Sequence, residues 1–128
     1  MIVVTDASVI VRGLEVDGAA RRLLVEHEIQ IPHLADSEIV HALRAQVRRG
    51  KVSGEDAVSR LRRWQRLGVA RYPSMMLLPR VWDLRASLSA YDATYVALAE
   101  ALECPLATAD LRLTRAPGPR CRIIATLS

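Results

Sequence analysis

Four acidic residues of this sequence stand where carboxylates could do chemistry together. Asp6 and Asp110 each follow directly after a short apolar run, and Glu38 and Asp92 each stand near the start of a segment with helical periodicity. In a parallel sheet with helical crossovers, every strand ends and every crossover helix begins at the same edge. We therefore expect these four side chains at one edge of a sheet.

Carboxylates gathered in a desolvated cleft repel one another, and some of them take up protons unless a cation neutralises them. A hard divalent cation such as Mg²⁺ or Mn²⁺ prefers oxygen ligands, keeps several waters and takes its remaining ligands from a phosphate group. Such an ion lowers the pKa of a bound water and offsets negative charge on a phosphate under attack. The four acids therefore indicate metal-dependent phosphodiester chemistry.

Each of the four acids also has a purely structural interpretation. Asp92 stands three residues after Ser89, which is the spacing of a capping box, and Asp110 could cap the turn that follows it. Asp6 could simply end a strand, and Glu38 could favour a helix N-terminus. A single acid is therefore weak support for a site, whereas four at one edge favour the chemical interpretation.

The elements that must position these acids follow from hydrophobic periodicity, because short runs rich in Val, Ile and Leu alternate with longer helical segments. Strands are predicted over residues 2–5, 29–32, 69–72, 106–109 and 122–125. Helices are predicted from Ser8 onward, over 19–28 and 35–49, after the capping box at 53–56, and over 78–87 and 91–102. Strands separated by helices predict an α/β fold with a parallel sheet covered on both faces, in a single domain over residues 1–128.

The helix expected over 35–49 has a regular apolar pattern. Ile39, Leu43 and Val47 recur every four positions, and Val40 lies beside them. This spacing predicts one apolar stripe that faces inward.

Composition narrows the class of protein. The 128 residues are 51 % hydrophobic, which suits one compact domain that buries roughly 65–70 % of its unfolded surface. No stretch reaches the roughly 18–20 apolar residues of a membrane span and no basic leader precedes the first apolar run, so we expect a soluble cytoplasmic protein. The absence of Phe, with two Trp and three Tyr, argues against an aromatic platform for base stacking.

The basic residues are nearly all arginine, with Lys51 as the one lysine, and the formal net charge is +4. Arginine binds phosphate through a bidentate fork, which favours a nucleic-acid or acidic-protein partner, although genomic base composition explains the bias equally well. Arg62 and Arg66 stand in the helical hairpin between the second and third strands. They form a candidate rim for RNA or a protein partner, and the alternative is a solvated helix face.

Four segments carry a family resemblance: VVTDAS at 3–8, DSEIVHAL at 36–43, LSAYDATYVALAE at 88–100 and LATADLRL at 106–113. In this order, over nearly the whole chain, they resemble the PIN-domain family, and more narrowly the VapC-type toxins of bacterial toxin–antitoxin (VapBC) systems. The resemblance implies a three-layer α/β/α fold with a parallel sheet. It also implies endoribonuclease activity with Mg²⁺, or Mn²⁺, held by Asp6, Glu38, Asp92 and Asp110, with Thr108 as a supporting polar neighbour.

The resemblance further implies a homodimer that is silenced by a cognate VapB-type antitoxin, which often places a basic residue at the acidic site. Water activated by the metal would cut RNA and leave 5′-phosphate and 3′-hydroxyl ends.

Two other functions compete with this interpretation. The first is a non-catalytic module that binds RNA or protein and whose carboxylates are structural. The second is a phosphoaspartate-type phosphatase, which also places an Asp after the first strand. Such enzymes need a lysine near the phosphate, and Lys51 lies in a loop between two predicted helices.

Overall fold

The computed structural model describes residues 1–126, which form a five-stranded sheet whose strand pairs are all parallel. The strand order is β3-β2-β1-β4-β5, so the chain builds outward from β1 in one direction and then returns to β1's other side. The order therefore reverses between β1 and β4, where ligands bind in open α/β sheets. The strands are β1 (Ile2–Thr5), β2 (Glu28–Pro32), β3 (Ala70–Tyr72), β4 (Leu106–Thr108) and β5 (Ile123–Ala125). All five predicted strands are confirmed, each within one residue at either end.

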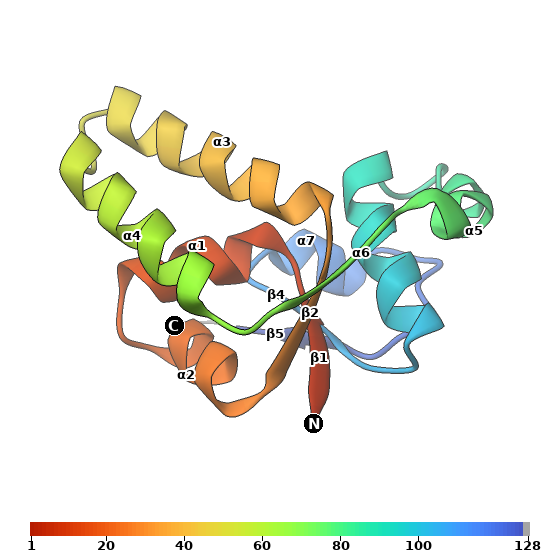
Figure 1. Cartoon of the computed structure of the whole chain (residues 1–128). Helices are drawn as coiled ribbons and strands as arrows, with labels where there is room; N and C mark the ends of the chain where they lie inside the picture. The colour runs from red at the N-terminus through yellow and green to blue at the C-terminus, as the bar shows by residue number, and fades with distance from the viewer. Residues whose placement is uncertain (127–128) are drawn as a thin grey trace.

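Helices cover both faces of this sheet, as Figure 1 shows, with α1, α2 and α4 on one side of the strands and α5 and α6 on the other. The predicted three-layer α/β/α architecture is therefore confirmed. The helices are α1 (Ala7–Glu15), α2 (Ala19–Glu26), α3 (Leu34–Arg48), α4 (Gly54–Arg66), α5 (Leu78–Asp83), α6 (Ala90–Ala101) and α7 (Leu111–Arg115), with a 3-10 turn η1 (Met75–Leu77) before α5.

The core is built around β1 and α6. Val3 and Val4 of β1 are fully buried, and α6 is buried continuously from residue 93 to 99. Complete burial of one such aliphatic side chain is worth about 1.5–3 kcal/mol. Because α6 packs against the central strands, the Asp92 that precedes its buried stretch is held in a fixed position at the edge of the sheet.

The predicted apolar stripe of α3 is only half right. Ile39 and Leu43 are buried, but Val40 and Val47 remain 50 % and 37 % exposed. The reason is visible in Figure 1, where the outer part of α3 extends away from the sheet with α4 as its neighbour. The apolar pattern of the sequence continues in this part of α3, although the hydrophobic core does not extend that far.

The helix predicted over 78–87 is shorter than expected, because α5 ends at Asp83 and the chain continues in turns to residue 87. Ser87 marks the change, since its hydroxyl donates a hydrogen bond to the Pro117 carbonyl at 2.7 Å. This tertiary contact replaces the helical continuation. Among residues 1–126, the helices are all too short or too polar to cross a membrane.

Candidate active site

The four acids predicted from the sequence come from four different elements and meet at the carboxyl edge of the sheet. Asp6 directly follows β1, and Asp110 lies two residues beyond the end of the neighbouring strand β4. Glu38 is carried by α3, which follows β2, and Asp92 lies in the first turn of α6. Glu38 was expected near the start of its helix, and it is the fifth residue of α3, which begins at Leu34.

Asp6 is buried and held by three donors. Its carboxylate accepts hydrogen bonds from the hydroxyls of Ser8 and Thr108 and from the backbone N–H of Val9 at 3.2 Å. The last of these makes Asp6 the N-cap of α1, which begins at Ala7. The prediction that Ser8 opens this helix was wrong, because the Ser8 hydroxyl donates to Asp6.

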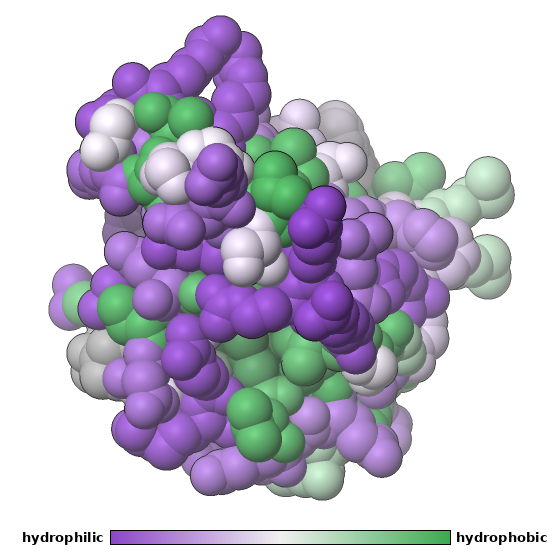
Figure 2. All heavy atoms as spheres, turned by 60° about the vertical axis from the view of Figure 1, so that its left-hand side comes forward, coloured by the Kyte–Doolittle hydropathy of each residue, from purple (hydrophilic) through white to green (hydrophobic). Residues whose placement is uncertain are grey.

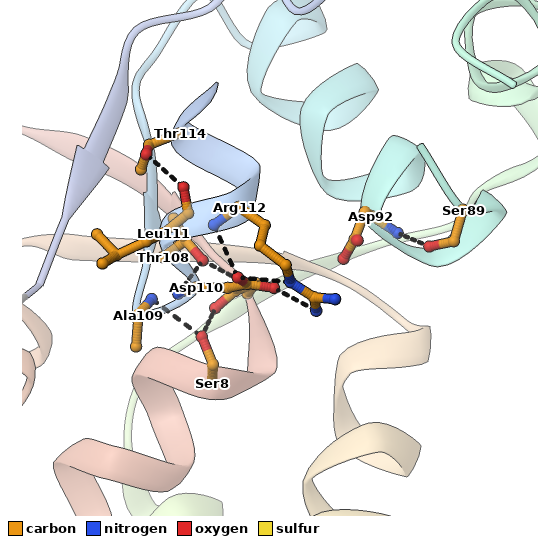
Figure 3. Close-up of polar contacts among 10 residues, drawn as sticks. Ser8, Ser89, Asp92, Thr108, Ala109, Asp110, Leu111, Arg112 and Thr114 are labelled. Atoms are coloured by element: carbon orange, nitrogen blue, oxygen red, sulfur yellow. Dashed lines mark hydrogen bonds and ion pairs between the residues drawn. The ribbon is translucent and has the colours of Figure 1, made fainter. Parts of the chain in front are cut away.

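The same hydroxyls tie the end of β4 to Asp6. Ser8 accepts a hydrogen bond from the Ala109 N–H, and Thr108 accepts one from the Asp110 N–H, both at 3.0 Å. Figure 3 shows this network around the turn that leads into α7. Thr108 therefore fixes the position of Asp110 relative to Asp6, and Ser8 performs a matching role that the sequence did not reveal.

Glu38 is held in place by a hydrogen bond from α6. The hydroxyl of Tyr95, a residue of α6 that is almost fully buried, donates to the Glu38 carboxylate. Tyr95 lies within the buried stretch of α6. Its contact with Glu38 was missed, because periodicity shows which face a residue lies on and not what its hydroxyl reaches.

Asp92 and Asp110 differ in their surroundings. The Asp92 N–H donates to Ser89 Oγ at 3.1 Å, so the predicted helix start at Ser89 is confirmed. Asp110 caps α7 by accepting from the Arg112 N–H at 2.9 Å, and the Arg112 side chain makes an ion pair with the same carboxylate at 2.9 Å. The structural interpretation of Asp110, as a cap of the turn that follows it, is therefore correct. A capping role does not prevent the same carboxylate from binding a ligand.

Burial and mutual repulsion perturb the titration of this cluster. Burial raises the pKa of Asp6, Glu38 and Asp92 above their ordinary values. Nearby negative charge adds to the increase: Asp92 acts on both Asp6 and Glu38, Asp6 acts on Glu38, and Asp110 acts on Asp92. Asp110 is the exception, since the hydrogen bonds from Arg112 lower its pKa. Perturbed carboxyls at the end of a parallel sheet are typical of a functional site.

The donor set suits a hard divalent cation, because it consists of carboxylate oxygens with mutually repelling charges. The side chains as they lie do not yet surround one, and within residues 1–126 no three carboxylate, imidazole or thiol groups gather closely enough to hold an ion. In this arrangement Glu38 accepts from Tyr95, and both oxygens of Asp110 accept from Arg112.

A groove of about 890 Å³ opens between α1 and α3 beside this cluster. Its lining includes Ser8 and Glu38 of the cluster, together with the apolar residues Val11, Leu34 and Ala42. A bound chain could therefore reach Glu38 from the groove.

Arg62 and Arg66 are exposed on α4, and neither makes a hydrogen bond or ion pair with the described part of the chain. Figure 2, in which this side of the molecule comes forward, shows a mainly hydrophilic surface with scattered hydrophobic patches. The arginine rim therefore stays a prediction. The arginine that lies at the acidic cluster is Arg112, which the sequence analysis did not single out.

Comparison with known proteins places this chain in a family. Residues 3–119 match the PIN domain. Ribonuclease VapC9 of Mycobacterium tuberculosis is 48 % identical over 121 residues, which cover 94 % of this chain and 95 % of the relative. Among solved structures, PAE2754 from Pyrobaculum aerophilum superposes with a TM-score of 0.73 at 23 % identity, covering 97 % of this chain and 83 % of the other.

A second solved structure, VapBC2 from Rickettsia felis bound to a DNA fragment from their promoter, matches with a TM-score of 0.72 at 16 % identity. The match covers 98 % of this chain and 99 % of that chain. The chain therefore belongs to the PIN-domain family and, within that family, to the VapC ribonucleases.

Proposed function

We propose that this VapC-type ribonuclease, the toxin of a toxin–antitoxin pair, cleaves RNA with Mg²⁺ or Mn²⁺ held by Asp6, Glu38, Asp92 and Asp110. One observation carries the proposal: four acids from four elements lie at the carboxyl edge of the sheet, and three of them have pKa values raised by burial and further by the charge of a neighbouring acid. Because RNA is the substrate, the proposed place of action is the cytoplasm.

The residues around the proposed metal ligands have separate roles. A divalent cation, when bound, lowers the pKa of a water for attack and neutralises charge on the phosphate. Ser8 and Thr108 fix the orientation of Asp6, and Tyr95 fixes that of Glu38, so that two ligands are preorganised by hydrogen bonds from the surrounding shell. Attack by water predicts products with 5′-phosphate and 3′-hydroxyl ends.

The antitoxin part of the proposal is supported by the groove between α1 and α3. Its apolar lining fits an extended or helical segment of a partner, and Glu38 is among its lining residues. A basic residue of a VapB-type antitoxin, entering along this groove, would meet the repelling carboxylates and silence the site. Substitution of Ala42 by a bulky residue such as Phe should then weaken inhibition by the antitoxin while RNA cleavage by the free toxin persists.

The homodimer part of the proposal is supported by an apolar surface on η1 and α5. Met75, Met76, Leu78 and Trp82 are 76 %, 86 %, 55 % and 65 % exposed, and neighbouring large apolar groups of this kind mark association surfaces. We expect Met76→Asp to shift the molar mass measured by light scattering from dimer to monomer. A mass that stays dimeric would place the interface elsewhere.

The metal requirement is tested by thermal unfolding with increasing Mn²⁺. A cation that binds the folded state raises the melting temperature with its concentration, and Asp6→Asn, which keeps a helix-capping side chain, should remove this rise. Product analysis by end labelling separates the mechanisms. A 2′,3′-cyclic phosphate would show attack by the RNA's own hydroxyl and contradict the proposal, and a melting temperature indifferent to metal would favour the non-catalytic module.

A further inference from the structure

Arg112 occupies an unusual position, because it is bound to a proposed metal ligand and yet is almost fully in solvent. Its Nε and Nη2 atoms donate to the two carboxylate oxygens of Asp110 at 3.2 and 2.9 Å. The side chain of Arg112 is nevertheless 91 % exposed, whereas that of Asp110 is 30 % exposed. Nothing apolar therefore holds the guanidinium in place, and its position depends on one carboxylate.

The guanidinium also lies close to a second proposed ligand. Figure 3 shows Arg112 reaching from α7 past Asp110 toward Asp92. Its positive charge acts on Asp92 as well as on Asp110. Arg112 thus supplies both acids with positive charge, as a divalent cation would.

The two positive groups compete for Asp110. Arg112 donates two hydrogen bonds to Oδ1 and one to Oδ2 of this carboxylate, so a cation that binds Asp110 competes with the ion pair for the same negative charge. Exposed ion pairs are weak and break easily in water. A released arginine at this edge would face the site from solvent, where its fork suits bidentate binding of a phosphate.

We propose that Arg112 is a movable counter-ion: it neutralises Asp110 in the metal-free protein and binds a backbone phosphate of the RNA once a divalent cation has taken Asp110. This inference rests on the proposed metal-dependent cleavage of RNA. It makes Arg112 a substrate-positioning residue, which offsets the repulsion between the acidic cluster and the polyanionic substrate.

Arg112→Gln tests the first half without any RNA. Removal of a competing exposed ion pair should tighten Mn²⁺ binding about two- to fivefold, measured from the melting temperature across a Mn²⁺ titration. Arg115→Gln is the matched control, because Arg115 lies in the same short helix, is exposed and makes no hydrogen bond or ion pair with residues 1–126. It should leave the Mn²⁺ affinity unchanged.

The second half is tested by binding of a short single-stranded RNA analogue with methylene-phosphonate linkages, which keep the negative charge, resist cleavage and leave all four proposed metal ligands in place. With Mn²⁺ present, Arg112→Gln should reduce the slope of log Kobs against log salt by about 0.7, the value for a single phosphate neutralised on a single strand. Arg112→Lys, which keeps the charge, should retain the slope.

Three results would overturn the proposal. They are an unchanged Mn²⁺ affinity in Arg112→Gln, a weakened one, and a salt slope equal to that of the parent. If instead the unsubstituted protein shows no response to Mn²⁺, the proposed metal site itself fails and the inference fails with it, so the two failures are distinguishable.

Discussion

The two ends of α6 each carry an acid, and their surroundings are opposite. Glu100, near the C-terminal end, accepts two hydrogen bonds from the Arg80 guanidinium at 2.7 and 3.1 Å and one from the Arg120 N–H at 2.7 Å. Asp92, in the first turn, makes no ion pair at hydrogen-bonding distance with a described residue. Glu100 is paired with an arginine at hydrogen-bonding distance, and Asp92 is not.

The titration of the two acids reflects this difference. Burial alone would raise the pKa of Glu100, but the hydrogen bonds and charge of Arg80 outweigh it and the pKa is lowered. Burial raises the pKa of Asp92, and the charge of Asp110 raises it further. A carboxylate held by a paired arginine stabilises the fold, whereas one without such a pair is available to a ligand.

The largest expected effect is on catalysis. Asp92→Asn should reduce RNA cleavage at least a hundredfold, roughly the upper range for loss of even an outer-shell partner of a metal, because it removes a proposed ligand. Cleavage of a labelled RNA measures this, and the circular dichroism spectrum should stay unchanged. Glu100→Gln is the control and should cleave normally. Equal loss in both variants would refute the functional distinction between the two ends of α6.

The next effect is on stability. Glu100→Gln should lower the free energy of unfolding by about 1–3 kcal/mol at neutral pH, since it leaves the partly buried Arg80 without its charged partner. Urea denaturation measures it. Asp92→Asn in metal-free buffer should not be destabilised, and a loss there comparable to that of Glu100→Gln would show that Asp92 is structural.

The pH dependence of the two variants should have opposite signs. Asp92 has a raised pKa, so above its ordinary value of 3.8 the folded state binds more protons than the unfolded state, and the wild type loses stability as pH rises through the raised pKa. The free energy of unfolding of Asp92→Asn should therefore increase relative to that of the wild type as pH rises across that window, by up to about 1.4 kcal/mol per unit of pKa shift.

Glu100 has a lowered pKa, so its stabilising contribution is present above its ordinary value of 4.5 and disappears as pH falls through the lowered folded value. The difference in free energy of unfolding between Glu100→Gln and the wild type should therefore disappear at acidic pH. Unfolding of both variants in metal-free buffer from pH 3 to 7 tests the pair, and curves of the same sign would contradict the assignment.

The smallest expected effect concerns the exposed arginines Arg62 and Arg66. Unlike Arg80 at the C-terminal end of α6, they pair with no acid of the described chain. If Arg62 and Arg66 form a rim that binds RNA, reversal of both to Glu should weaken RNA binding and flatten its salt dependence by about 0.7 for each phosphate that is no longer neutralised. Arg22→Glu, an exposed position on α2, is the control. An unchanged slope would remove Arg62 and Arg66 from the RNA footprint.

The sequence predicted the elements well because apolar periodicity is a local property of the chain. All five strands and their parallel arrangement follow from it, and Asp6 and Asp110 are identified by their place after buried runs. Prediction failed where a local pattern continues beyond the core, as at Val47, and where a distant hydrogen bond ends a helix, as at Ser87.

What the sequence by itself determined is the set of acids and the edge at which they gather, because strand ends and helix starts follow from periodicity. Only the tertiary structure decided which donor faces each acid: Tyr95 for Glu38, Ser8 for Asp6 and Arg112 for Asp110. Hydrogen bonds act over about 3 Å, and the spacing of residues along a chain does not specify distances between elements to that precision. The packing of α3, α6 and α7 around the sheet does.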